Sequence, residues 1–131
     1  MKRMVFLFSI GTVLLLAGEA FMGISAAQEA ALVEMTDDNK YDPERVTIRA
    51  GETVKWTNPS KAVHTVTADP AKAATPDHVE LPPNAEVFDS GNIQPGGTYS
   101  HKFDVPGRYK YFCIPHEKMG MIGEVEVRPA G

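Results

Sequence analysis

The chain is poor in cysteine, because Cys113 is the only one among its 131 residues. A single cysteine cannot form a disulfide within the chain, so its thiol is free, paired with another molecule or bound to a metal. An ordinary free cysteine behaves as a small buried hydrophobe. Here, however, Cys113 lies three residues before His116, and this spacing favours a metal site.

Other signals are also missing. No glycine pattern resembles a phosphate-binding loop, and no serine or histidine has an obvious catalytic partner. We find no internal repeat and little helical periodicity. Basic residues are fewer than acidic ones, 13 against 17, which gives a formal net charge of −4. This balance argues against a nucleic-acid partner and weakly favours a cationic one.

One apolar run, Met4 to Leu16, follows two basic residues and precedes the small residues Ser25-Ala26-Ala27. This order is typical of a secretory signal peptide. The run is short for a bilayer span, which needs about 20 apolar residues. The leader has no cysteine for a lipid anchor and no paired arginines for twin-arginine export. We therefore predict a cleaved signal peptide at residues 1–27 and a single domain at 28–131.

The expected product is an exported monomer with no stable membrane span after processing. Loss of the leader removes two basic residues and one acidic residue, so the net charge becomes −5. The periplasm is the first expectation for its location, and a thylakoid lumen or a cell surface remain open.

Alternating short runs broken by glycine, proline and asparagine fill the rest of the chain. Regularly spaced short strands with turn signals indicate an all-β sandwich or barrel. The expected strands cover residues 31–36, 45–49, 53–57, 64–67, 88–91, 98–103, 108–113 and 122–128. The proline-rich segment 69–83 is expected to be a long surface loop with room for one helical turn.

Strand alternation predicts where the candidate ligands point. Side chains in a strand alternate between its two faces, so a solvent-facing Lys110 turns Cys113 inward. The same parity turns His64 and Met121 inward, and His116 arrives from the loop that follows Cys113. All these side chains are therefore expected near one end of the sandwich.

A thiolate, two imidazoles and a weak thioether suit copper that cycles between two oxidation states. Zinc is the alternative metal, but a zinc site usually takes a third strong donor rather than a thioether. Met119 and Met121 compete for the weak position, and ordinary apolar packing is the alternative for each. Parity favours Met121. We expect one mononuclear copper ion bound by His64, Cys113, His116 and Met121.

These residues resemble the cupredoxins, in particular the plastocyanin, pseudoazurin and halocyanin-like blue-copper proteins. The resemblance covers nearly all of residues 31–128, and its strongest part is Cys-x-x-His-x-x-x-x-Met at 113–121. Further matches are Val54–Asn58, Phe88–Gly91 and Pro106–Cys113. It implies a Greek-key β-sandwich of about seven to eight strands with the same four copper ligands. It also implies one-electron shuttling between redox proteins, such as a cytochrome or a copper or haem reductase or oxidase.

Three positions depart from the plastocyanin pattern. Thr65 stands where asparagine usually follows the first histidine, so the hydrogen bonds between the two ligand loops are expected to differ. Phe112 replaces a tyrosine before the cysteine, which removes a hydroxyl from any lateral electron route. Glu117 and Lys118 place charge beside His116, where plastocyanins are more apolar.

The predicted function is an exported blue-copper electron carrier and not an enzyme. A copper-binding or delivery protein is the first alternative, but it would need a more open site rich in methionine or histidine. A copper oxidase or nitrite-reducing enzyme would need additional histidines for a second copper centre. Of the remaining candidates, His101 is expected to be structural, Trp56 to belong to the core, and His78 to be at most part of a second, weak metal site.

Overall fold

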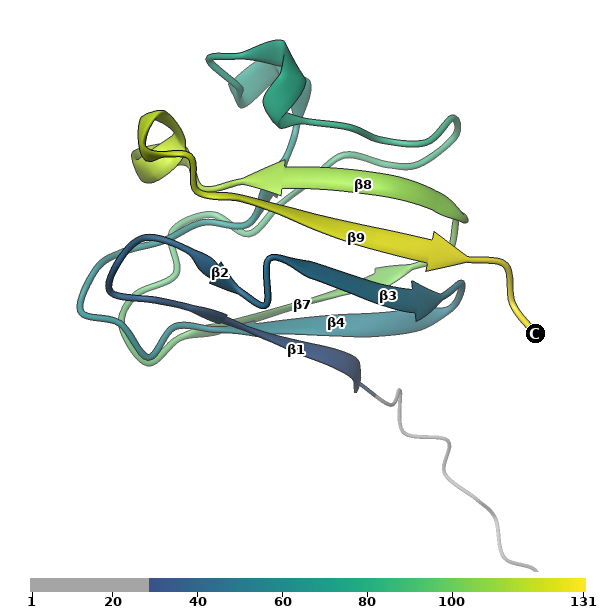
Figure 1. Ribbon diagram of the computed structural model, residues 1–131, viewed down its shortest axis with the longest axis horizontal. Coiled ribbons are helices and arrows are strands. Elements are labelled where there is room, and N and C mark those ends of the chain that lie inside the picture. The colour runs from purple at the N-terminus through teal and green to yellow at the C-terminus, as the bar shows by residue number, and fades with distance from the viewer. Residues whose placement is uncertain (1–28) are drawn as a thin grey trace, which may run out of the picture.

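The computed structural model describes residues 29–131, and the predicted signal peptide at 1–27 lies outside this range. Two β-sheets pack face to face over the described part of the chain (Figure 1), which confirms the predicted all-β sandwich. No helix among these residues is long and apolar enough to cross a membrane. The elements are β1 (Glu29–Met35), β2 (Tyr41–Asp42), β3 (Arg45–Arg49), β4 (Glu52–Thr57), β5 (Thr67–Ala68), η1 (Pro70–Lys72), η2 (Pro76–His78), β6 (Phe88–Asp89), β7 (Thr98–Phe103), β8 (Gly107–Phe112), η3 (Ile114–Met119) and β9 (Ile122–Arg128).

One sheet has the strand order β2-β1-β4-β7 and the other has the order β3-β9-β8-β5-β6. β1 pairs in parallel with β4, and β3 pairs in parallel with β9, whereas the other neighbours are antiparallel. The two-residue strand β2 was not expected from the sequence.

The expected strand 64–67 is wrong in its position, because the strand β5 covers only Thr67–Ala68. His64 forms a single bridge with Ile93. The next two backbone N–H groups bond to side chains rather than to a neighbouring strand: Thr65 donates to Cys113 Sγ and Val66 donates to Ser90 Oγ. A regular ladder therefore cannot begin before residue 67.

Aromatic side chains join the two sheets through the core. Trp56 of β4 and Tyr111 of β8 are both fully buried. The Trp56 Nε1–H donates to the Tyr111 hydroxyl at 3.1 Å, and the two rings meet at 84° with centroids 5.4 Å apart. This edge-to-face contact satisfies the buried indole N–H while it packs one sheet on the other. Trp56 is thus a core residue, as predicted.

Segment 69–83 runs beside β8 and pairs with it at one point. Alternation placed Phe112 on the outer face with Lys110, yet Phe112 has no exposed surface. Lys110 forms a bridge with Glu80, and its Nζ donates to the Asp77 carbonyl at 3.1 Å. The segment contains two 3-10 turns, η1 and η2, rather than one helical turn, and Lys110 connects it to β8.

Gly123 of β9 lies where the close contact between β8 and β9 leaves no room for a larger residue. It lies opposite Tyr111, and a Cβ atom at this position would overlap the phenol ring. We expect Gly123→Ala to lower the free energy of unfolding by about 1–3 kcal/mol through overpacking. Denaturant unfolding of the copper-free protein measures this difference. The control Glu126→Ala changes an exposed residue of the same strand and should stay within about 0.5 kcal/mol of the unmodified protein; equal stabilities for the two variants would contradict the prediction.

Candidate metal centre

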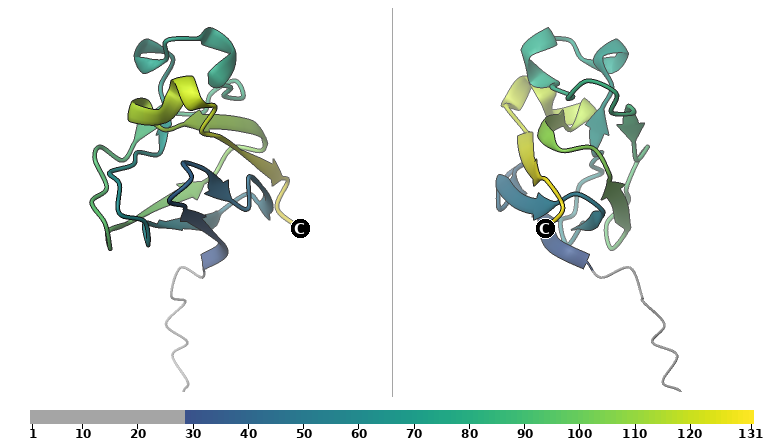
Figure 2. Two further views of the ribbon diagram at one scale, coloured as in Figure 1. Left: turned by 60° about the vertical axis from the view of Figure 1, so that its left-hand side comes forward. Right: turned by 90° about the vertical axis from the view of Figure 1, so that its right-hand side faces the viewer.

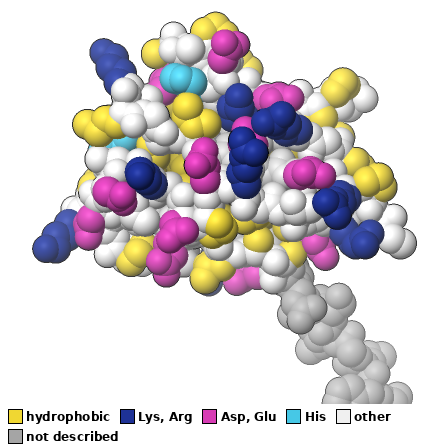
Figure 3. Space-filling view, viewed as in Figure 1, with side chains coloured by type: hydrophobic (Ala, Val, Ile, Leu, Met, Phe, Trp, Pro, Cys, Tyr) yellow, Lys and Arg dark blue, Asp and Glu magenta, His cyan; other side chains and the backbone are white. Residues whose placement is uncertain are grey.

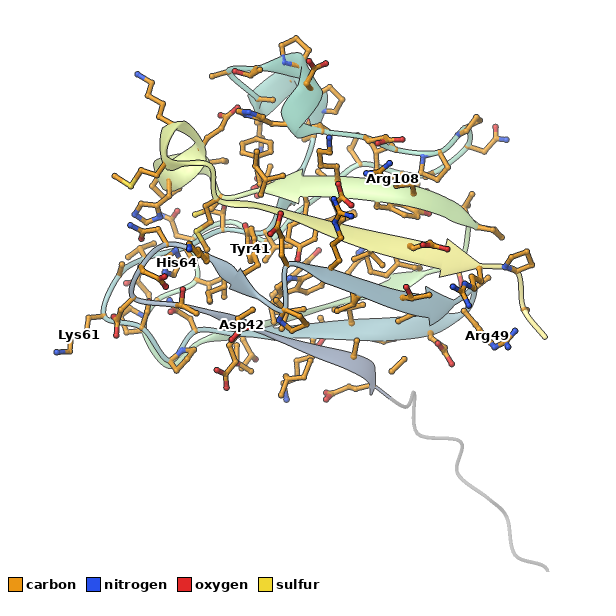
Figure 4. All side chains as sticks on the ribbon, in the orientation of Figure 1. Tyr41, Asp42, Arg49, Lys61, His64 and Arg108 are labelled. Atoms are coloured by element: carbon orange, nitrogen blue, oxygen red, sulfur yellow. The ribbon has the colours of Figure 1, made fainter. Side chains whose placement is uncertain are left out.

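The structure brings one thiol and two imidazoles together at one end of the sandwich. Cys113 Sγ lies 3.7 Å from His64 Nδ1 and 3.3 Å from His116 Nδ1. All three donor atoms lie within 4.8 Å of one another. Figure 4 shows His64 at the end of the molecule opposite Arg49. The sequence predicted this convergence, with His64 and Cys113 turned inward by strand parity and His116 arriving from the loop after Cys113.

The backbone between Cys113 and Met121 closes on itself. The Cys113 N–H donates to the Met121 carbonyl at 3.1 Å, and the Met121 N–H donates to the His116 carbonyl at 3.3 Å. The turn η3 ends at Gly120, whose φ of 78° lies in the left-handed region that favours glycine. This reversal returns the chain so that Met121 comes to lie beside Cys113.

The two methionines differ sharply in their surroundings. Met121 has no exposed surface, whereas the side chain of Met119 is 69% exposed. The Met119 sulfur accepts a hydrogen bond from Asn39 Nδ2 at 3.4 Å, on the outside of the loop. Met121 is thus buried next to Cys113 in the backbone, whereas the Met119 side chain lies on the surface.

His64 is oriented by a small polar network that the sequence did not reveal. Its Nε2 lies 2.9 Å from Ser60 Oγ, and the Ser60 hydroxyl donates to Asn58 Oδ1 at 2.6 Å. Because the hydroxyl proton is used in that bond, the Ser60 oxygen accepts from Nε2–H. This pattern assigns the ring proton to Nε2 and leaves the Nδ1 lone pair facing Cys113.

Thr65 links the two loops that carry the candidate ligands. Its N–H donates to Cys113 Sγ at 3.3 Å, and its Oγ1 accepts from the Ile114 N–H at 2.9 Å. The Tyr41 hydroxyl donates to the Thr65 carbonyl at 2.6 Å and fixes the same residue from the β2 side. The threonine therefore supplies the inter-loop hydrogen bonds at the position where the sequence departs from the plastocyanin pattern.

Burial sets the protonation of the copper-free cluster. It raises the pKa of the Cys113 thiol, and the hydrogen bonds from Thr65 and His116 only partly oppose this shift. Burial also lowers the pKa of His64, with a further contribution from the nearby charge of His116. The neutral imidazole presents a lone pair, and a metal would displace the thiol proton. One soft thiolate with two imidazoles fits copper in either oxidation state.

Comparisons with known proteins agree with this geometry. Residues 28–128 match the family of copper-binding proteins described as the plastocyanin/azurin family. The chain belongs to this family. It is 37% identical to the chloroplastic plastocyanin of Tetradesmus obliquus over 119 residues, which cover 86% of the chain and 78% of that relative. It is 34% identical to a plastocyanin of Synechococcus sp. (strain JA-2-3B'a(2-13)) over 119 residues, which cover 82% of the chain and 80% of that protein.

Solved cupredoxin structures share the fold. The copper(I) form of an amicyanin variant superposes with a TM-score of 0.60 at 26% identity, over 79% of this chain and 87% of that one. Pseudoazurin from Methylobacterium extorquens superposes with a TM-score of 0.59 at 25% identity, over 75% of this chain and 74% of that one. Together with the His-Cys-His cluster, these matches identify a cupredoxin that carries electrons through a single copper ion and is not an enzyme.

The other histidines of this cupredoxin lie outside the cluster. The imidazole of His101 stacks on Phe88 with ring centroids 4.1 Å apart, and that of His78 bonds to Glu117. Within residues 29–131, His64, Cys113 and His116 form the only group of three side chains of the His, Cys, Asp and Glu types that could hold a metal. The described part of the chain therefore offers no second copper centre of this kind.

The hydroxyl of Thr65 provides a test of the inter-loop contact. Thr65→Val keeps the shape of the side chain but leaves the part-buried Ile114 N–H without an acceptor. We expect a loss of about 1–3 kcal/mol in the free energy of unfolding and faster hydrogen exchange at Ile114. Denaturant unfolding and exchange of the copper-free protein measure the two effects. Thr47→Val, at an exposed position of β3, is the control; an unchanged exchange rate at Ile114 would show that the contact is dispensable.

Proposed function

We propose that the protein carries single electrons between redox proteins through one copper ion held by His64, Cys113, His116 and Met121. The observation that carries this proposal is the convergence of one thiol and two imidazoles at one end of the β-sandwich. Their donor atoms lie within 4.8 Å of one another. When bound there, copper takes up and releases one electron. The task of the polypeptide is to hold the four donors in one arrangement in both states.

Three of the four proposed ligands are held from within the fold. Ser60 orients the ring of His64, Thr65 bonds to the Cys113 sulfur, and the backbone of Met121 is paired with that of Cys113. Side chains fixed in this way move little when the charge of the site changes, which favours fast electron transfer.

His116 supplies the route for electrons to the outside. It is half-buried, whereas His64, Cys113 and Met121 have no exposed surface. The exposed apolar side chains Ile114 and Met119 lie in the same loop. An apolar rim of this kind lets a partner approach the imidazole edge closely without desolvating charges. We infer that partners dock here, and a cytochrome or a copper or haem reductase or oxidase has suitable chemistry.

The export of this carrier belongs to the same proposal. Residues 1–27 would act as a cleaved signal peptide, and the periplasm is the favoured compartment, with a thylakoid lumen or a cell surface as alternatives. Figure 3 shows acidic and basic side chains mixed over β3, β9 and β8. Arg45 and Arg108 both pair with Glu124, at 3.0 and 2.8 Å. A charged face of this kind suits contact with water and supports the proposed monomer.

The thiolate provides the direct test of the proposed site. The mature protein loaded with copper(II) should show an intense thiolate-to-copper absorption that a reductant bleaches. We expect Cys113→Ser to abolish this absorption, because a hydroxyl cannot supply the charge-transfer donor. Visible and electron paramagnetic resonance spectra measure the result. Weak tetragonal copper signals in the unmodified protein would refute the site, and rapid binding and release of copper without a reversible one-electron wave would favour the delivery function.

The two methionines provide a matched pair of variants for the axial ligand. Met121→Leu should alter the electron paramagnetic resonance spectrum and shift the reduction potential, because the axial donor tunes both properties. Met119→Leu removes the same chemical group from an exposed position and should leave the spectrum and the reduction potential almost unchanged. Protein-film voltammetry and the spectra of the two variants measure the difference. A larger effect at Met119 would overturn the ligand assignment.

A further inference from the structure

Glu117, directly after His116, is the one buried carboxylate among residues 29–131. Its side chain is only 7% exposed, although its place in a charged loop gives no hint of burial. A buried carboxylate is costly unless hydrogen bonds compensate for the loss of water. The partners of this group therefore need an explanation.

All hydrogen-bond donors to the Glu117 side chain come from one distant segment. The Ala74 N–H lies 2.9 and 3.1 Å from its two oxygens, the Thr75 N–H donates at 3.1 Å, and the His78 Nδ1 lies 2.9 Å away. A carboxylate oxygen can only accept from a backbone N–H, so the Ala74 and Thr75 amides donate to Glu117. The His78 Nδ1 faces the same oxygen at 2.9 Å and is placed to donate to it as well.

Segment 74–78 is itself fixed to the body of the protein. Just before it, Lys72 pairs with Asp89 of β6. Within it, the Asp77 carbonyl accepts from Lys110 Nζ of β8. Figure 2 shows the turns of residues 70–78 next to η3 at the same end of the molecule. Glu117 therefore connects the ligand loop to a support that both strands hold in place.

The ligand loop is attached to other segments on both sides of His116. Ile114 bonds to the Thr65 hydroxyl two residues before the imidazole, and Glu117 bonds to segment 74–78 one residue after it. The Gly120 N–H also donates to the Glu117 carbonyl at 2.9 Å, so the backbone that leads to Met121 starts from the same residue. Among the described residues, loss of the Glu117 contacts would leave the loop from Glu117 to Gly120 held only by its own turn and by the weak bond from Asn39 to the Met119 sulfur.

We propose that Glu117 is a positioning residue that latches the ligand loop to Ala74, Thr75 and His78, holds His116 in place, and slows the loop opening through which copper leaves. The latch acts through the loop and makes no contact with the metal. The effect on copper rests on the proposed ligand set, whereas the latch itself can be tested without metal.

The experiment measures hydrogen exchange in the copper-free protein and copper(I) removal by excess chelator in the loaded protein. Glu117→Ala should speed exchange at the Ala74 and Thr75 amides and chelator removal by about tenfold each, because charge-assisted bonds are lost. Glu117→Gln keeps one carbonyl acceptor and should give an intermediate rate. His78→Ala should give a partial effect, and the double variant should be no faster than Glu117→Ala alone, because one unit is being broken.

Two controls separate the latch from charge and from global stability. Lys118→Ala removes one charge of the opposite sign from the adjacent exposed residue and should leave both rates unchanged. Gly123→Ala lowers overall stability through β9. For the same loss in the free energy of unfolding, this variant should lose copper to the chelator more slowly than Glu117→Ala. Equal rates in these two variants, or unchanged Ala74 and Thr75 exchange in Glu117→Ala, would overturn the latch. A Cys113→Ser protein that stays intensely coloured would instead refute the ligand set and leave the exchange result standing.

Discussion

The contact between the Thr65 N–H and the Cys113 sulfur joins two segments that lie 48 residues apart. The copper end of the molecule depends on it, because it connects the segment that carries His64 with the loop that carries Cys113 and His116. It places His64 beside the thiol and brings the Thr65 hydroxyl within reach of Ile114. The same residue takes the chain out of the sheet, so the strand that was expected at 64–67 begins late. The irregular backbone and the metal cluster therefore have one physical cause.

Residue types and the spacing of Cys113 and His116 were enough to point to the cluster. Strand alternation set the face of Cys113 from the charged Lys110, but it does not apply to His64, which forms a single bridge ahead of β5 and lies in no strand. Alternation did not predict the burial of Phe112, since it assigns a residue to a face of the sheet but cannot say what covers that face. Segment 69–83 has no period of its own, and its packing on β8 depends on contacts such as that between Glu80 and Lys110.

The supporting residues could not be predicted for a related reason. Ser60 and Asn58 lie in a turn after a strand, where small polar residues are common and usually serve the turn itself. Glu117 stands next to a lysine in a loop and has the appearance of a solvated charge. Their roles arise from partners that are distant in sequence, such as His78 for Glu117. Hydrogen bonds between residues far apart in the chain leave no recognisable pattern in the sequence. The short spacing between Cys113 and His116 does leave one.

The unequal exposure of the four proposed ligands has a consequence for small competing molecules. Three of them have no surface in contact with water, and His116 alone reaches it. Anions such as azide or cyanide would have to pass this imidazole before they could reach the thiol, because the other three side chains have no exposed surface. One ring would then provide both the proposed electron path and the access route for anions, so a substitution that widens the access would also alter the electron path.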